Sequence, residues 1–206
     1  MIQSDSLSTW TGVDVDNLME VQNLVEDGFD DFIKETLASW NIQYLTDIQQ
    51  HAVKAGVMLG QSMIVSAPTS SGKTLVGELA ALAGIRSGKQ IIYLVSHKAL
   101  ADQKYLDFYQ RFGESAKTPL ATIGLSTGDR EEGDVDAQFT VATYEKALGL
   151  LLAGQLRSND AVVIADELQI LREEGRGPEI ETLCAVVVKS YWPQVYSYAS
   201  IFVLTR

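Results

Sequence analysis

A run of small residues followed by a lysine and a threonine is the first feature of the sequence that could do chemistry. Residues 67–74 read APTSSGKT, between an apolar segment and a stretch with helical periodicity. They match the phosphate-loop pattern G-x-x-x-x-G-K-[ST], with alanine in place of the first glycine. Small residues let backbone N–H groups converge on phosphate oxygens, and the N-terminus of the following helix favours anions. The predicted nucleotide-binding residues are Thr69, Ser70, Ser71, Gly72, Lys73 and Thr74.

Within this loop, Lys73 is expected to reach the β- and γ-phosphates, and the Thr74 hydroxyl to bind Mg²⁺. The alternative is a Ser/Gly turn that begins a helix, with Lys73 in solvent. The position of the loop between a strand and a helix favours the phosphate site.

Two adjacent carboxylates, Asp166 and Glu167, follow the apolar segment 161–165. At the end of a buried strand, Asp166 would hold Mg²⁺, and Glu167 would orient and deprotonate the attacking water. Taken alone, the acidic pair would favour a simpler role for Asp166, the capping of the following helix. The phosphate loop upstream favours the metal role, so we expect Lys73, Asp166 and Glu167 to be the catalytic residues.

Alternating apolar and helical segments must position these residues. Apolar runs predict strands at residues 62–66, 90–95, 120–123, 139–142, 161–165 and 199–204. Helical spacing predicts helices at residues 29–40, 46–58, 73–86, 99–111, 144–153 and 177–188. This alternation is typical of an α/β fold with a mainly parallel sheet flanked by helices, in which ligands bind at the carboxyl ends of the strands.

Composition restricts the class of protein. The 206 residues carry 16 Lys and Arg against 27 Asp and Glu, a net charge of −11, which argues against strong autonomous binding of nucleic acid. Cys184 is the only cysteine, so an intramolecular disulfide is excluded. The sequence shows neither a signal peptide nor an apolar run long enough to span a bilayer, and we expect a cytoplasmic protein without membrane contact.

The first 28 residues differ in character from the rest. They are acidic, and Leu18, Val21, Leu24 and Val25 have the spacing of an amphipathic helix. We predict a leader at residues 1–28 that packs loosely on a domain formed by residues 29–206.

Several segments, in order and spacing, resemble motifs of the first RecA-like motor domain of superfamily 2 DExH/DEAD-box helicases, in the Ski2-like branch. The matching segments are residues 41–49 (Q-motif), 67–74 (motif I), 96–104 (motif Ia), 126–129 and 141–146 (strand-facing segments), 166–169 (motif II) and 176–181 (the RGP run of the branch). The resemblance implies a RecA-like P-loop NTPase fold and an ATP-dependent helicase that uses ATP and Mg²⁺.

The resemblance also implies roles for single residues. Gln49 would read the adenine edge, with Phe29 as a candidate for the aromatic ring that stacks on the base. Lys98, Thr127, Gly128 and Thr143 would face bound nucleic acid, RNA or DNA.

The strand-facing residues make physical sense without the family. Threonine hydroxyls can hydrogen-bond phosphates, and Lys98, Lys104 and Lys146 can add charge along one edge. The alternative is that Thr143 caps the helix after it and that the lysines are ordinary solvated surface.

The chain departs from the family pattern in three places. Gln169 stands where a histidine usually couples the nucleotide site to motif III. Residues 195–206 do not align with motif III, and a second RecA-like domain, which in the family supplies an arginine finger, is absent from this sequence.

We therefore expect the ATP-binding motor domain of a helicase, whose ATP hydrolysis drives translocation or unwinding in the complete enzyme, together with a second RecA-like domain or a partner chain. The alternative is a truncated, weakly hydrolysing or non-hydrolysing module that needs a partner chain and has a nucleotide-dependent role, either regulatory or in binding nucleic acid.

Overall fold

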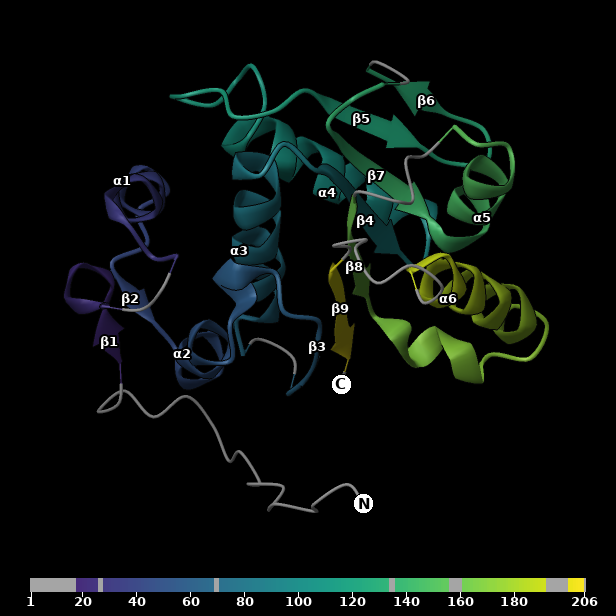
Figure 1. Ribbon diagram of the computed structural model, residues 1–206. Coiled ribbons are helices and arrows are strands. Elements are labelled where there is room, and N and C mark those ends of the chain that lie inside the picture. Colours follow the sequence, from purple (N-terminus) through teal and green to yellow (C-terminus); the bar gives the residue numbers. More distant parts are fainter. Residues whose placement is uncertain are drawn as a thin grey trace, which may run out of the picture.

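The computed structural model describes residues 18–25, 28–68, 71–133, 136–155, 161–191 and 200–205. Its helices are α1 (Asp31–Ser39), α2 (Asp47–Lys54), α3 (Lys73–Arg86), α4 (Lys98–Arg111), α5 (Tyr144–Leu152) and α6 (Gly177–Tyr191). Its strands are β1 (Met19–Glu20), β2 (Tyr44–Leu45), β3 (Met63–Ser66), β4 (Gln90–Val95), β5 (Ile123–Ser126), β6 (Glu131–Glu132), β7 (Phe139–Thr143), β8 (Ala161–Asp166) and β9 (Ser200–Thr205). Figure 1 shows their arrangement.

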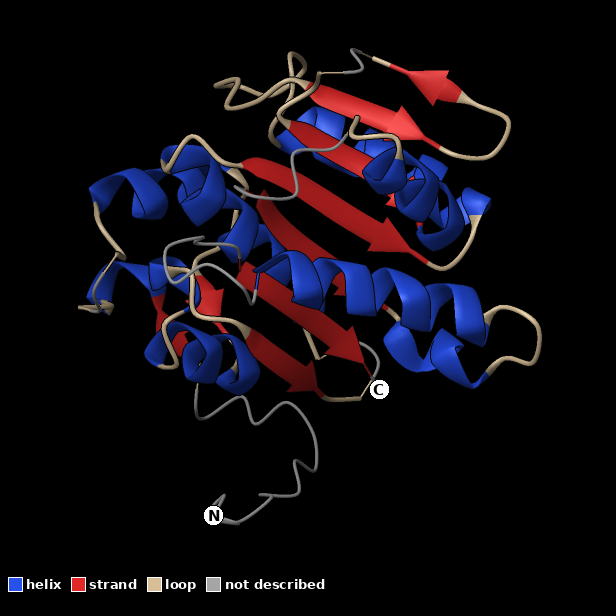
Figure 2. Ribbon diagram, turned by 45° about the vertical axis from the view of Figure 1, so that its right-hand side comes forward, coloured by secondary structure: helices blue, strands red, loops and turns tan. Residues whose placement is uncertain are grey.

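A seven-stranded sheet forms the centre of the domain (Figure 2), with strand order β3-β9-β8-β4-β7-β5-β6. Every pairing is parallel except that of β5 with β6. The central strands β4, β7 and β8 are buried almost throughout, which explains why they read as continuous apolar runs. The predicted α/β fold with a mainly parallel sheet is confirmed.

Helices cover both faces of the sheet. In Figure 1, α1, α2 and α3 lie on one side of the strands, and α5 and α6 lie on the other. Side chains alternate along a strand, so Tyr93 of β4 packs in the core on the α3 and α4 side, whereas Ile92 and Leu94 pack against α5 and α6. The parallel sheet therefore has a hydrophobic core on each face.

Two predicted elements differ in their bounds. The strand expected at residues 120–123 begins only at Ile123, because the Leu120 and Ala121 N–H groups both donate to the Phe112 carbonyl and close a turn after α4. The helix expected at residues 46–58 ends at Lys54, and a separate 3₁₀ turn, Val57–Leu59, follows Gly56. Glycine is a poor helix former, which favours the break there.

The prediction of an amphipathic helix near the N-terminus is wrong. Met19–Glu20 pairs with Tyr44–Leu45 as a small antiparallel sheet, and a 3₁₀ turn follows at Val21–Asn23. Val21 and Leu24 are only 1% and 2% exposed, so this part of the leader packs tightly rather than loosely. Residues 1–17 and 26–27 lie outside the described residues, and the domain boundary at 28 stays a prediction. In the part of the chain that the structure describes, no helix has the length and apolar character needed to cross a membrane.

Candidate functional site

The predicted motifs meet at one edge of the sheet because the strands that precede them are parallel. The phosphate loop follows β3, motif Ia follows β4, and Asp166 ends β8. Thr127 follows β5, and Thr143 ends β7. Carboxyl ends of parallel strands form the usual ligand edge of such folds.

The phosphate loop turns sharply into α3. Gly72 has a φ of +88°, a left-handed conformation that suits glycine, and Lys73 begins the helix. The Lys73 ammonium donates to the Ala67 and Pro68 carbonyl oxygens at 2.6 and 2.7 Å, so it lies over the loop rather than in solvent. Thr69 and Ser70 lie outside the described residues.

Ser71 gives the loop an unsatisfied polar atom. The residue is 1% exposed, and its Oγ is one of two buried side-chain oxygens without a hydrogen-bond partner in the described part of the chain, the other being that of Thr140. Buried polar groups are usually hydrogen-bonded, and an exception inside a phosphate-loop motif fits a ligand that supplies acceptors. The loop residues therefore suit a nucleotide phosphate.

Gln49 fastens the N-terminus of α2 to this loop. Its Oε1 accepts from the Thr46 N–H at 2.8 Å, and its Nε2 donates to the Gly72 carbonyl at 3.0 Å. The Thr46 hydroxyl donates to the Ser71 carbonyl at 3.2 Å. Gln49 thus holds the loop, and its role in reading adenine stays a prediction.

The aromatic residues upstream of Gln49 are placed differently from one another. Phe29 is 4% exposed and packs in the hydrophobic core, so its ring would have to move before it could stack on a base. Phe32, on α1, is 38% exposed and lies under the Arg86 guanidinium. The guanidinium carbon is 5.5 Å from the centroid of the Phe32 ring.

The two predicted magnesium ligands, Thr74 and Asp166, both lie beside the ammonium group of Lys104. The Lys104 Nζ donates to the Thr74 hydroxyl at 3.3 Å and lies 3.9 Å from Asp166 Oδ2. The Tyr93 hydroxyl also donates to Asp166 Oδ2, at 2.8 Å. Burial, followed by the neighbouring Asp166, raises the pKa of Tyr93 well above its ordinary value, so the phenol stays a donor. The Thr74 hydroxyl and the Asp166 carboxylate, both beside the Lys104 ammonium, offer the oxygen ligands that Mg²⁺ prefers.

The expectation that Lys104 adds charge to the strand-facing edge is therefore wrong. Lys104 is 9% exposed and lies on the buried face of α4 with Ala101 and Phe108. The spacing of these three residues, one and two helical turns apart, was the available signal that Lys104 points inward.

Glu78 was missed by the sequence reasoning. It lies one turn after Thr74 on α3, is 3% exposed and forms an ion pair with Arg111. Burial raises its pKa from 4.5 to about 7, partly offset by Arg111 and Lys104. A cavity of about 420 Å³ beside the loop is lined by these residues together with Gly72 and Thr74. A single carboxylate in the otherwise apolar and small run LVGELAALAG was its only sequence signal.

Glu167 follows Asp166 in a strained backbone conformation. Its φ and ψ of +56° and +44° are left-handed, which is uncommon for a residue other than glycine. Its Oε2 accepts a hydrogen bond from Ser96 Oγ at 3.1 Å. Gln169 lies half-buried in the 3₁₀ turn Leu168–Arg172 that follows, and its coupling role stays a prediction.

A second cavity, of about 550 Å³, lies beside the predicted strand-facing residues. We call it the strand-facing cavity, and it is lined by His97, Lys98, Gly128, Thr143, Glu145, Lys146 and Arg176. The structure thus brings Lys98, Gly128 and Thr143 together. Thr143 precedes α5, but its side chain makes no capping hydrogen bond.

Thr127 and the lysines of the strand-facing edge already form hydrogen bonds or ion pairs within the protein. Thr127 is 2% exposed, and its hydroxyl donates to the Arg130 carbonyl and accepts from the Arg130 N–H, both at 3.2 Å, so it closes a turn. Lys98 pairs with Asp129 at 2.8 Å, and Lys146 pairs with Glu131 at 2.7 Å. A bound strand would have to compete with these acidic partners.

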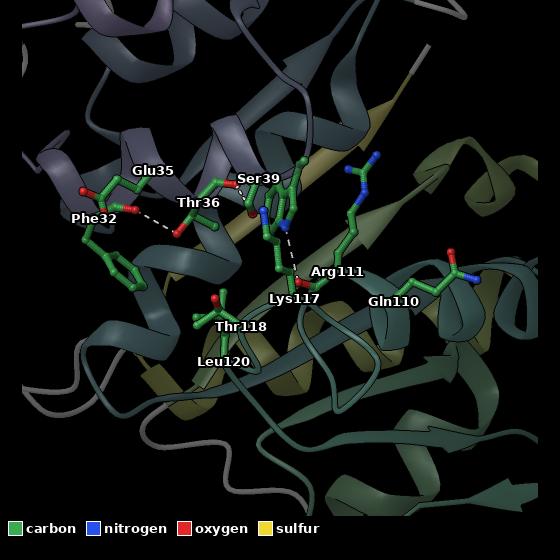
Figure 3. Close-up of a pocket in the computed structure, with 10 residues that line it drawn as sticks. Phe32, Glu35, Thr36, Ser39, Gln110, Arg111, Lys117, Thr118 and Leu120 are labelled. Atoms are coloured by element: carbon green, nitrogen blue, oxygen red, sulfur yellow. Dashed lines mark hydrogen bonds between the residues drawn. The ribbon is translucent and has the colours of Figure 1, made fainter.

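A smaller cavity of about 170 Å³ lies between α1 and the C-terminal end of α4. Figure 3 shows Phe32, Thr36 and Ser39 along one side, with Arg111 and Lys117 opposite them. It shares Gln110 and Arg111 with the cavity beside the phosphate loop. None of the predicted site residues lines it.

A mainly parallel α/β sheet with a phosphate-loop motif and an acidic pair at the carboxyl ends of its strands is typical of P-loop nucleotide-binding domains, the RecA-like ones among them. The model of the DEAD/DEAH box helicase family matches residues 46–197. The chain therefore belongs to the DEAD/DEAH box helicase family.

Its relatives are ATP-dependent helicases. It is 37% identical over 155 residues to a probable ATP-dependent helicase, MJ1401, of Methanocaldococcus jannaschii, covering 73% of this chain and 19% of the relative. It is 36% identical over 165 residues to the ATP-dependent DNA helicase Hel308 of Methanocella arvoryzae, covering 76% and 22% respectively. The chain thus spans about a fifth of the length of these curated relatives, and the expected resemblance to Ski2-like helicases is confirmed.

A solved structure has a similar fold. The DUF1998 helicase MrfA, bound to DNA and AMPPNP, superimposes with a TM-score of 0.68 at 18% identity, covering 88% of this chain and 26% of that one. At this identity the likeness concerns the fold. Residues 46–197 of the chain thus form a helicase domain of this family.

Proposed function

We propose that this domain binds Mg-ATP and hydrolyses it to drive translocation or unwinding of nucleic acid in the complete enzyme. The observation that carries the proposal is that Thr74, in the first turn of α3, and Asp166, at the end of β8, converge on one cation, the Lys104 ammonium. Divalent magnesium between the same oxygens would neutralise phosphate charge, which is the main task of such sites.

The residues of the chain divide this task. The loop residues and Lys73 would hold the phosphates, and Thr74 and Asp166 would hold Mg²⁺. Glu167, which follows Asp166 in the sequence and has a left-handed backbone conformation, would orient the water and accept its proton. Gln49 would keep Gly72, and with it the loop, in position for the nucleotide.

Nucleic acid would lie on the strand-facing cavity, with Lys98, Gly128 and Thr143 contacting its backbone. Such contacts position a strand without reading its sequence. Because Lys98 is already paired with Asp129 and the chain carries a net charge of −11, this domain alone would bind weakly. A second RecA-like domain or a partner chain would supply further contacts and the arginine finger.

The test is ATP turnover with and without single-stranded DNA or RNA, together with titration of a fluorescent ATP analogue. Turnover stimulated by either polymer and abolished by Lys73→Ala supports the motor function. Lys54→Ala, which removes an exposed lysine at the end of α2, is the matched control and should behave as the wild type. Comparison of the two polymers decides between RNA and DNA.

A second candidate is a nucleotide-dependent binding module that does not turn over ATP. The Lys73 ammonium is held by two carbonyl oxygens of its own loop, which favours this alternative. Nucleotide binding without turnover, under every polynucleotide condition and with a second domain supplied, would select the module.

A further inference from the structure

Ser96 lies between the acidic pair and the strand-facing cavity. It follows β4 directly, is 6% exposed, and its hydroxyl donates to Glu167 Oε2 at 3.1 Å. The Ser96 Oγ also lies 2.8 Å from Nδ1 of His97. The side chains of Glu167, Ser96 and His97 therefore form, in this order, a continuous chain of hydrogen-bonding groups.

The outer end of this chain reaches the proposed nucleic-acid site. His97 is exposed and lines the strand-facing cavity together with Lys98, Gly128 and Thr143. Since Nδ1 faces Ser96, Nε2 is the ring nitrogen that remains to meet a ligand in the cavity.

The backbone of Ser96 is held from the same side. The Arg176 guanidinium donates to the Ser96 carbonyl oxygen and also to Glu145 Oε1, the latter at 2.7 Å. Both Arg176 and Glu145 line the strand-facing cavity. Ser96 therefore stays in place relative to that cavity while its hydroxyl proton can rotate.

The single proton of the hydroxyl makes the arrangement a two-state element. A serine hydroxyl donates once, and one nitrogen of a neutral imidazole donates while the other accepts. While Ser96 donates to Glu167, His97 must carry its proton on Nδ1 and donate to Ser96. A phosphate oxygen that accepts from Nε2 of the neutral imidazole favours the tautomer in which the proton has moved from Nδ1 to Nε2. In that tautomer Nδ1 is an acceptor and draws the Ser96 proton away from Glu167.

We propose that Ser96 is a positioning residue that releases the Glu167 carboxylate when a nucleic-acid phosphate binds at His97. The inference rests on the proposed function, since it assumes that polynucleotide occupies the strand-facing cavity and that Glu167 acts on water. The release leaves the Oε2 lone pair that Ser96 had occupied available to the attacking water. Polynucleotide would thereby stimulate turnover without any shift of the sheet.

The test uses NMR spectra of the chain with ¹⁵N-histidine and ¹³C-glutamate side chains, titrated with single-stranded oligothymidylate without nucleotide. The chain has only two histidines, His51 and His97, so His97→Gln assigns the imidazole and Glu167→Gln assigns the carboxyl. We expect the wild-type imidazole to change from the Nδ1–H to the Nε2–H tautomer and the Glu167 carboxyl carbon to shift with it.

Variants of Ser96 separate positioning from general structure. In Ser96→Ala, His97 should still respond to the oligonucleotide while the Glu167 signal stays constant, and Ser96→Thr, which keeps a hydroxyl, should restore the response. Ser87→Ala removes an exposed hydroxyl at the end of α3 and should respond as the wild type. A Glu167 shift that persists in Ser96→Ala overturns the proposal, and so does conversion of His97 to the doubly protonated form without a Glu167 shift.

Kinetics distinguish this proposal from the proposed function. In Ser96→Ala, the stimulation of turnover by polynucleotide should fall roughly tenfold, the effect of one hydrogen bond to a charged group, with unchanged ATP affinity. If the linked shifts of His97 and Glu167 occur without turnover, the proposed hydrolysis fails and the linkage stands. If turnover is stimulated by polynucleotide without the linked shifts, only the linkage fails.

Discussion

The side-chain amide of Gln49 donates a 3.0 Å hydrogen bond to the carbonyl oxygen of Gly72, so the first turn of α2 is fastened to the last residue before α3. The two residues are 23 positions apart in the chain. The contact makes the shape of the phosphate loop depend on a helix that the loop itself does not contain.

Gly72→Ala should therefore disturb the phosphate loop in two ways. A Cβ at this position would lie 2.2 Å from Gln49 Nε2, and the φ of +88° disfavours any side chain. We expect a loss of about 1–3 kcal/mol in the free energy of unfolding in urea, and at least tenfold weaker binding of a fluorescent ATP analogue.

Gly88→Ala is the matched control for this substitution. Gly88 also has a positive φ, +71°, but nothing lies within 4 Å of its added Cβ. The variant should lose stability through its backbone alone, about 1 kcal/mol, and should bind nucleotide as the wild type. Equal nucleotide affinity in both variants would contradict the role of the Gln49 contact.

Lys104→Met tests the shared cation at Thr74 and Asp166. Removal of the ammonium leaves the Asp166 carboxylate with the Tyr93 hydroxyl and without its nearby positive charge. A divalent cation then has no competitor at these oxygens, so we expect Mn²⁺, measured by electron paramagnetic resonance, to bind about tenfold more tightly. Lys146→Met removes a lysine paired with Glu131 elsewhere and should leave Mn²⁺ affinity unchanged. Weaker Mn²⁺ binding in Lys104→Met would show that Lys104 supports the site rather than competing for it.

Glu167→Gly should separate stability from activity. Glycine adopts the φ of +56° without strain, and the substitution also removes a negative charge next to Asp166. We expect a gain of about 0.5–1 kcal/mol in urea unfolding, together with loss of ATP turnover.

Asn41→Gly is the control for the backbone effect. Asn41 has a similar φ of +60°, but asparagine tolerates this conformation better than glutamate does, so its replacement should change stability less. A destabilised Glu167→Gly would mean that the Ser96 hydrogen bond outweighs the backbone strain.

Glu78 should make stability depend on pH. Its pKa in the folded chain is about 7, above the ordinary 4.5, so the folded state binds more protons than the unfolded state between these values. Stability therefore falls as the pH rises from about 4.5 to about 7, by roughly 3 kcal/mol in total. Urea unfolding at a series of pH values measures this slope.

Glu78→Gln should remove that slope, because an amide resembles the protonated acid and does not titrate. At pH values above 7 the variant is expected to be at least as stable as the wild type, despite losing the charge that pairs with Arg111. Glu179→Gln, at an exposed glutamate of α6, controls for the loss of one negative charge. An unchanged slope in Glu78→Gln would assign the pH dependence to other groups.

Local patterns determined much of this protein. Runs such as residues 161–165, buried on both faces, and helices such as α3, whose bounds match the prediction, are encoded by periodicity over a few residues. Short connections between them make a parallel sheet the natural arrangement, and its strand ends then gather the motifs at one edge. The family resemblance followed from the order of those same motifs.

The sequence by itself did not say what each side chain at that edge touches. Lys104 reaches Thr74 across 30 positions, and Ser96 reaches Glu167 across 71. Such contacts depend on the face that a helix turns to the sheet and on which strands become neighbours, and neither is fixed by residue type. The sequence therefore determined the class of protein and its phosphate-loop motif. The tertiary structure decided that Lys104 lies beside both predicted magnesium ligands and that Thr127 closes a buried turn, because only the packing of distant segments sets those distances.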